Sequence, residues 1–309
     1  MPKYHVERSI LINSPMETIR NVLLNFHQWI PWSPWLISEP DAKLSYSESQ
    51  GTPGSYYSWN GKLVGKGKMT LTAIDEQKLE MQLNLLSPFK TQSQVWFDLL
   101  PEKHGTRVVW NMHGKLPFFL FFMLKTMKSW IGMDYQRGLA MLKEYIETGM
   151  VLSRVEIIGK TTLTPTPYIG ISGICALEDL GKIMPPLFQK LGEFAKTQQL
   201  ASNSPPFSIY NHINMYTQKV DYTCATPVPK DTPVTDDLEY GELPALPVLQ
   251  VNHTGRYENL GNAWSSAAAY ARANKIKLRK SPKGFEYYPD DPAEIELKDL
   301  KTIVYLPLR

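Results

Sequence analysis

The sequence predicts an α+β protein of two domains, and three observations support this prediction. The chain has 309 residues, about twice the length of a typical single domain. Seven of its eight tryptophans precede residue 150, which indicates two cores of different composition. The first half predicts, in order, a strand, a short helix, an antiparallel meander and a long helix, whereas the second half predicts one pattern of strands and helix that occurs twice. We expect domains at 1–149 and 155–309, joined by a linker at 150–154.

The composition is that of a globular protein, with 43% hydrophobic and 20% charged residues, and excludes a disordered chain. A net charge of +3 is too small for the basic face that nucleic-acid binding requires, so no direct nucleic-acid binding is expected. The start of the chain lacks a secretory signal, and the two cysteines form no CxxC pair. We therefore expect a cytoplasmic protein.

The most apolar run is LPFFLFFML at residues 116–124. It is shorter than half of the ~20 residues that cross a bilayer, so no membrane insertion is expected. We interpret the run as the buried start of a helix, with a lipid-contacting patch as the alternative.

In the first half, alternating residues at 4–12 predict a strand, and Ser14-Pro15 is typical of a helix start. Residues 54–114 predict a meander with a hairpin turn at Asn60-Gly61, because the short connections leave no room for crossover helices. Apolar residues three or four apart predict a long helix over 124–146. A sheet that curves around this helix tends to leave an apolar cavity.

Residues 3–148 resemble the START-like, polyketide-cyclase-like superfamily (SRPBCC). The matching stretches are RSILINSPMETI, WIPWSPW, GSYYSWNGKLVGKGKMTL, GTRVVWNMHG and GLAMLKEYIE. This resemblance implies a helix-grip fold with a hydrophobic ligand cavity and says little about chemistry. Trp59 and Trp110 are candidates to line that cavity, and the alternative is that both are ordinary core aromatics.

The second half contains an internal repeat. LEDLGK at 177–182 recurs as YENLGN at 257–262, and SPPFSIY at 204–210 recurs as SPKGFEYY at 281–288. Each copy predicts a strand, a helix and two further strands, and Pro185-Pro186 predicts a kink or a break in the first helix. Two such βαββ copies usually pair their sheets around a pseudo-twofold axis and leave a groove between their helices.

The two copies differ at one telling position, where Glu286 replaces Ser208. One alternative places Glu286 in solvent on a half-exposed strand. The other places it in a pocket with aromatic walls, because Tyr257, Trp264 and Tyr288 come from the same copy. A carboxylate among aromatic rings suits a lipophilic cation, since ring faces attract cations and one buried charge selects the sign of the ligand.

These residues also support a second resemblance, of about residues 155–309 to the GyrI-like small-molecule-binding domain of AraC-type and MerR-type regulators. The motifs are TGRYENLGNAW, GFEYYPDDP and TIVYLPL. The resemblance implies that Glu286 contacts cationic or polyaromatic ligands, with Trp264 and Tyr257 as aromatic walls. Tyr288 and Tyr168 complete the expected ligand-binding set. Drug or toxin sensing, or sequestration, is the implied role.

One departure from the family is important. In regulators this domain follows a DNA-binding helix-turn-helix, whereas here it follows the START-like domain, so direct transcriptional regulation is not expected. An accessory role, in which the protein docks onto a separate regulator, stays open, and any protein partner is unknown.

Catalytic and metal motifs give little support to an enzyme. The six histidines are scattered without metal-ligand spacing, and nucleophile-elbow and phosphate-loop motifs are absent, so we expect no metal and no cofactor. Glu286 is the one candidate acid or base. Because some GyrI-like proteins hydrolyse cyclopropanoid alkylating agents, a detoxifying hydrolase that uses Glu286 is the alternative function.

Overall fold

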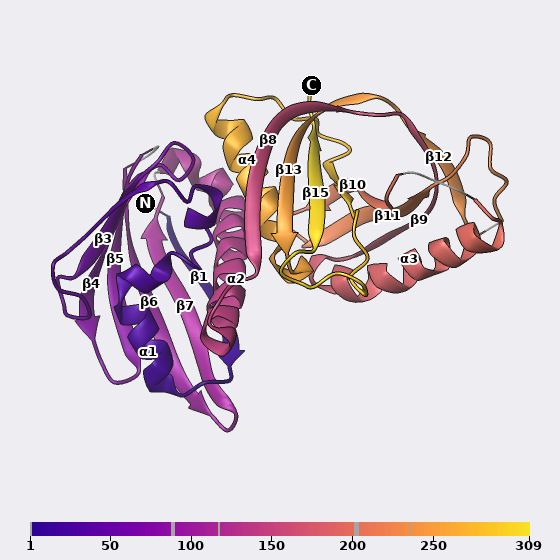
Figure 1. The fold of residues 1–309 in the computed structure, drawn as a ribbon. Helices are drawn as coiled ribbons and strands as arrows, with labels where there is room; N and C mark the ends of the chain where they lie inside the picture. Colours follow the sequence, from indigo (N-terminus) through magenta and orange to yellow (C-terminus); the bar gives the residue numbers. More distant parts are fainter. Residues whose placement is uncertain (1, 88–89, 117, 201–203, 236) are drawn as a thin grey trace. The chain divides into compact units, whose positions relative to one another are not determined.

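The computed structural model describes residues 2–87, 90–116, 118–200, 204–235 and 237–309. It divides into two compact units, Met1–Val151 and Leu152–Arg309, each built on its own antiparallel sheet (Figure 1). We call them unit 1 and unit 2. The predicted α+β fold class, with one long helix against the first sheet and a duplicated second unit, is confirmed.

Unit 1 contains a seven-stranded sheet in the order β1-β7-β6-β5-β4-β3-β2. Short helix α1 (Met16–Leu24) follows the first strand, as predicted, and buries Ile19, Val22 and Leu23. The remaining strands form the predicted meander, preceded by one unpredicted strand, β2. The strands are β1 (Lys3–Ile12), β2 (Lys43–Tyr46), β3 (Tyr56–Asn60), β4 (Lys66–Ile74), β5 (Lys78–Ser87), β6 (Thr91–Glu102) and β7 (Gly105–Lys115).

The predicted two-residue turn at Asn60-Gly61 is wrong, because residues 61–65 form a wider loop between β3 and β4. Glu39, which follows the short 3-10 turn η2 (Leu36–Ser38), explains the difference. Its carboxylate accepts hydrogen bonds from the backbone N–H groups of Lys62, Leu63 and Val64 at 2.7, 2.7 and 2.9 Å. A carboxylate from a distant segment therefore stabilises an open loop that local turn chemistry does not indicate.

Helix α2 (Leu124–Thr148) matches the predicted long helix and ends at Gly149, whose φ of 84° suits glycine. Tyr135 on its inner face stacks on Trp110 of β7 with ring centroids 4.0 Å apart. Gly138 permits this approach, because a Cβ there would lie 2.7 Å from the Trp110 ring. Aromatic rings thus fill the space between helix and sheet around Trp110.

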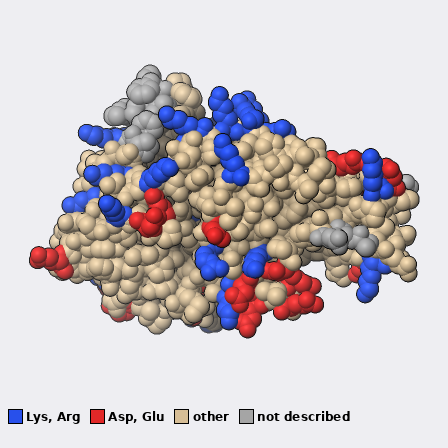
Figure 2. Space-filling view, turned by 45° about the horizontal axis from the view of Figure 1, so that its top comes forward, with Lys and Arg blue, Asp and Glu red and all other residues tan. Residues whose placement is uncertain are grey.

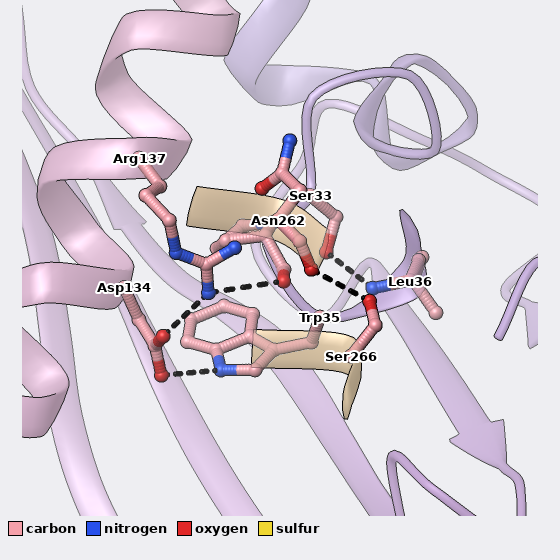
Figure 3. Close-up of polar contacts among 8 residues, drawn as sticks. Ser33, Trp35, Leu36, Asp134, Arg137, Asn262 and Ser266 are labelled. Atoms are coloured by element: carbon pink, nitrogen blue, oxygen red, sulfur yellow. Dashed lines mark hydrogen bonds and ion pairs between the residues drawn. The ribbon is translucent and has the colours of Figure 1, made fainter. Parts of the chain in front are cut away.

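A polar network attaches the WIPWSPW segment to α2 (Figure 3). The Trp35 indole N–H donates to Asp134 at 3.1 Å, and Arg137 pairs with the same carboxylate at 2.6 Å. Arg137 also donates to the carbonyl of Pro34 at 3.4 Å. The two prolines exclude regular structure in this segment, and these contacts to α2 hold it in place instead.

The run at 116–124 differs from its prediction. It contains the 3-10 helix η3 (Phe118–Met123), and the side chains of Phe121 and Phe122 are 59% and 68% exposed. A fully buried start of the helix is therefore wrong for these two residues; residue 117 and the side chains of 118–120 lie outside the description. Within the described residues, no helix combines the length and the apolar character that crossing a membrane requires.

Unit 2 contains an eight-stranded antiparallel sheet in the order β12-β9-β11-β10-β14-β15-β13-β8. The predicted duplication is present, and each copy has one strand more than predicted. The elements are β8 (Ser153–Leu163), β9 (Thr166–Ala176), α3 (Leu180–Thr197), β10 (Phe207–Asn214), β11 (Lys219–Pro227), β12 (Glu239–Leu243), β13 (Leu246–Gly255), α4 (Gly261–Ala273), β14 (Gly284–Tyr287) and β15 (Lys301–Pro307).

The two extra strands, β8 and β12, exchange partners between the copies. β8 begins the first copy and pairs with β13 of the second, whereas β12 begins the second copy and pairs with β9 of the first. Ser153 and Arg154, which we expected in the linker, are the first residues of β8. The pairing of β10 with β14 joins the two copies into one continuous sheet, and the exchanged strands form its two edges.

Helices α3 and α4 cover one face of this sheet. Helix α3 is continuous through Pro185-Pro186, so of the predicted alternatives, a kink or a break, the break is wrong. Apolar residues of α3 pack on β9 and β11, those of α4 pack on β13 and β15, and Trp264 belongs to both groups. A separate apolar cluster, which includes Phe207, Phe285 and Tyr287, lies on the opposite face.

Candidate functional site

Glu286 lies at the centre of the unit 2 sheet, on the face that the helices cover. It stands on β14 opposite Ser208 of β10 and Val304 of β15. Because side chains alternate along a strand, Phe285 and Tyr287 point to the other face. The side chain of Glu286 is buried, with 5% exposure, so the solvent-facing alternative is wrong.

Three side chains donate hydrogen bonds to this carboxylate. Tyr210 and Tyr288 both donate their hydroxyls to Oε2, at 2.6 and 2.7 Å, and the Trp264 indole N–H donates to Oε1. The hydroxyls of Ser208 and Tyr288 also lie within hydrogen-bond distance of each other, at 2.9 Å. The network spans β10, β14 and α4, and it fixes the position of the carboxylate.

The electrostatics of Glu286 reflect two opposing effects. Burial away from water raises the pKa of Glu286, and the hydrogen bonds from Tyr210, Trp264 and Tyr288 work against this rise. The charge of Glu286 acts in turn on its neighbours, because burial and the nearby carboxylate raise the pKa values of Tyr210 and Tyr288. Both tyrosines therefore stay protonated and able to donate.

Tyr288 connects the carboxylate to further aromatic rings. The Tyr288 ring contacts Phe188 of α3 and Tyr257 edge to face, with centroid distances of 5.3 and 5.8 Å. Tyr257, on the 3-10 turn η5 (Tyr257–Asn259) before α4, is 37% exposed. Burial raises the pKa of Tyr257 to about 12, and the charges of Asp290, Asp291 and Glu286 add to the rise. The buried carboxyl group of Glu286 is thus linked through Tyr288 to the partly exposed ring of Tyr257.

Pseudo-symmetry explains how the site is built. The repeat offsets of 78 and 80 residues make four pairs of equivalent positions, namely Ser208 and Glu286, Tyr210 and Tyr288, Met184 and Trp264, and Leu177 and Tyr257. The first pair is also a pair of opposite residues on adjacent strands, so the pseudo-twofold axis passes through it. In three of the four pairs, only the second copy has an acidic or aromatic residue; in the fourth pair, both copies have tyrosine.

The structure brings together four of the five residues expected to bind ligand: Glu286, Trp264, Tyr257 and Tyr288. Tyr168 does not join them, because β9 turns it to the opposite face, where it packs edge to face on Phe207 at 5.5 Å. Tyr210 and Phe188 were missed. Alignment of the repeats contains the signal for Tyr210, since it is the equivalent of Tyr288.

Trp110 and Trp59, the two residues expected to line a cavity in unit 1, differ in burial. Trp110 is fully buried within the aromatic cluster, and its indole N–H has no hydrogen-bond partner among the described residues. Trp59 is half-buried at the border of that core, where its ring covers Gly67 and its N–H donates to the Val64 carbonyl at 3.3 Å. Trp110 is thus placed as a core aromatic.

The chemistry of the unit 2 site favours a fixed counter-charge. Both oxygens of Glu286 already accept hydrogen bonds, an arrangement that holds a charge in place better than it transfers a proton. Among the residues that the structure describes, three or more His, Cys, Asp or Glu side chains do not gather in any group that could hold a metal ion.

Each unit matches the model of a known family. Residues 3–147 match the model for polyketide cyclase / dehydrase and lipid transport, and residues 158–309 match the model for the GyrI-like small molecule binding domain. The chain is a fusion of these two domain types. Both predicted resemblances are therefore confirmed, and Glu286 lies within a GyrI-like small-molecule-binding domain.

Solved structures give more distant matches. The EcmrR C-terminal domain is 19% identical with a TM-score of 0.43, and the match covers 52% of this chain and 99% of that one. An EcmrR–DNA complex is 17% identical with a TM-score of 0.41, covering 62% and 68%. A protein from Thermus thermophilus is 18% identical with a TM-score of 0.36, covering 48% and 99%. No curated protein matches the chain.

Proposed function

We propose that unit 2 binds lipophilic organic cations, with Glu286 as the buried counter-charge and Tyr257, Trp264 and Tyr288 as aromatic contacts. The role of the protein is then to sense or sequester cationic drugs or toxins. The observation that carries this proposal is the burial of one carboxylate that is held by three donors and linked through Tyr288 to the partly exposed ring of Tyr257.

Burial of a carboxylate without a cation is costly, because desolvation penalises its charge. A bound organic cation removes part of this cost through direct attraction in a low dielectric. Each aromatic face adds cation–π attraction of about 0.5 to 2 kcal/mol. A neutral ligand gains only the aromatic contacts, and an anionic one meets repulsion from Glu286, so charge rather than shape decides the selectivity.

The test compares two ions of equal shape and opposite charge, tetraphenylphosphonium and tetraphenylborate, by calorimetric titration. We expect the wild-type protein to bind the cation at least about tenfold more tightly than the anion. In Glu286→Gln the side chain keeps its size and loses its charge, so the preference for the cation should disappear.

The matched control is Glu258→Gln, which removes the same charge from an exposed residue beside Tyr257. It should keep the preference for the cation. Circular dichroism verifies that both variants are folded. Equal cation affinity of the wild type and Glu286→Gln, or an equal loss in both variants, would contradict the proposal.

A further inference from the structure

One end of unit 1 combines exposed aromatic side chains with lysines. The strand registers bring the start of β1, the end of β7, the end of β5, the start of β6 and the start of β4 to the same end of the sheet. Lys3 stands opposite Lys115, and Lys66 stands opposite Ser87. Because η3 and α2 follow β7 directly, the first turns of α2 begin at this end as well.

Four segments that meet at this end are rich in lysine. Residues 2–5, 60–68, 84–93 and 113–130 contain eight lysines and no aspartate or glutamate, in a chain whose net charge is only +3. Lys3, Lys66, Lys90, Lys115 and Lys128 are all exposed. Lys and Arg side chains also gather at the upper left of Figure 2, with few acidic side chains among them.

Two acidic residues, Glu39 and Asp41, precede β2, whose first residue, Lys43, stands opposite Asn60 at this end. Glu39 contacts the loop at 61–65, where it accepts hydrogen bonds from three backbone N–H groups. Its charge is directed at the backbone of that loop. The lysines on β1, β7 and α2 stand on other segments.

Exposed apolar side chains lie among the lysines. Phe121 and Phe122 are 59% and 68% exposed, and Trp130 is 49% exposed on the second turn of α2. Leu86, at the end of β5, is 46% exposed. Leu124, Met127 and Ile131 on these first turns pack against the core of unit 1, whereas Trp130 presents apolar surface that the core does not use.

We propose that this end of unit 1 docks reversibly on an anionic lipid surface. Phenylalanine and tryptophan side chains insert readily among lipid headgroups, and a surrounding set of lysines is attracted to anionic lipids. Charge complementarity selects this partner, since a neutral apolar partner gains nothing from the lysines. Such docking places the protein at the membrane surface.

The experiment is co-sedimentation of the full chain with vesicles of phosphatidylcholine alone or mixed with phosphatidylserine. We expect binding to the mixed vesicles, weak or absent binding to phosphatidylcholine, and release when the salt concentration rises. Lys128→Glu and Phe122→Ser should each lower the partition coefficient by about fivefold or more, because one removes electrostatic attraction and the other removes inserted apolar surface.

Two matched controls separate this surface from general effects. Lys103→Glu makes the same charge change in the β6–β7 hairpin, at the opposite end of the same sheet. Ile174→Ser removes a residue that is 70% exposed on β9 of unit 2. Both controls should bind like the wild type. Absence of binding to the mixed vesicles, as expected if the surface instead fits an acidic protein, or an equal loss in the controls, would overturn the proposal.

Discussion

Tyr287 and Tyr288 are adjacent in sequence and belong to different environments, because strand alternation sends them to opposite faces of the unit 2 sheet. Tyr288 donates to Glu286 at 2.7 Å, whereas Tyr287 stacks on Phe207 with centroids 4.8 Å apart. Substitution of each by phenylalanine removes one hydroxyl and keeps the ring. The two variants therefore separate the role of a hydroxyl at Glu286 from that of a hydroxyl elsewhere.

We predict that Tyr288→Phe changes the pH dependence of cation binding and that Tyr287→Phe does not. A cation binds the ionised carboxylate, so affinity is present above the pKa of Glu286 and is lost as pH falls through it. Burial already raises this pKa, and loss of the Tyr288 donor raises it further. Titrations of tetraphenylphosphonium from about pH 8 to about pH 5 should give a higher midpoint for Tyr288→Phe. An unshifted midpoint in Tyr288→Phe contradicts the assigned role.

At this same scale, the sequence identified Glu286 because its repeat equivalent is the uncharged Ser208. It missed Tyr210, although Tyr210 is the repeat equivalent of Tyr288. Only the pairing of the strands shows that both tyrosine hydroxyls donate to the same carboxylate. Tyr168 was assigned to the site without knowledge of its strand register. A one-residue difference along β9 decides which face a side chain occupies.

At the scale of elements, the exchanged strands β8 and β12 are the part of the fold that the sequence did not reveal. Each pairs with a strand of the other copy, and local patterns contain no information about that choice of partner. The long helix α2 and the core strands were predictable because their apolar periodicity is local. The prediction of a turn at Asn60-Gly61 was wrong for the same reason that the exchanged strands were missed, because the loop at 61–65 is held by Glu39, which comes from a distant segment.

A buried histidine at the β8–β13 pairing leads to a prediction about acid stability. His253 on β13 is fully buried, its Nε2 lies 3.0 Å from the hydroxyl of Ser153 on β8, and burial lowers the pKa of His253 from 6.5 to about 4. Between these two values the unfolded chain binds the proton more strongly, so stability falls as pH falls. Linkage gives a loss of about 2 kcal/mol between pH 7 and pH 5 from this group.

Urea unfolding of the wild type and of His253→Gln at the two pH values measures this contribution. The variant should lose about 2 kcal/mol less than the wild type over the same interval. His212→Gln, which replaces an exposed histidine in the same unit, should keep the wild-type pH dependence. If the His253 and His212 variants respond alike, neutral burial of His253 is not the source of acid sensitivity.

At the scale of the whole molecule, the two proposed activities are assigned to different units. Every residue of the Glu286 site lies in Leu152–Arg309, and every residue of the proposed lipid-docking surface lies in Met1–Val151. Each unit also has its own sheet and its own apolar core. A protein of this kind can concentrate at an anionic membrane through one unit while it captures lipophilic cations through the other.

This division predicts that each activity survives separation of the units. A fragment of residues 152–309 should bind tetraphenylphosphonium within about twofold of the affinity of the full chain, because the three donors to Glu286, namely Tyr210, Trp264 and Tyr288, all lie inside it. A fragment of residues 1–151 should sediment with phosphatidylserine vesicles and leave the cation unbound. Circular dichroism establishes that both fragments are folded. A folded 152–309 fragment with a tenfold weaker affinity would mean that the site depends on unit 1, and the assignment of binding to one unit would fail.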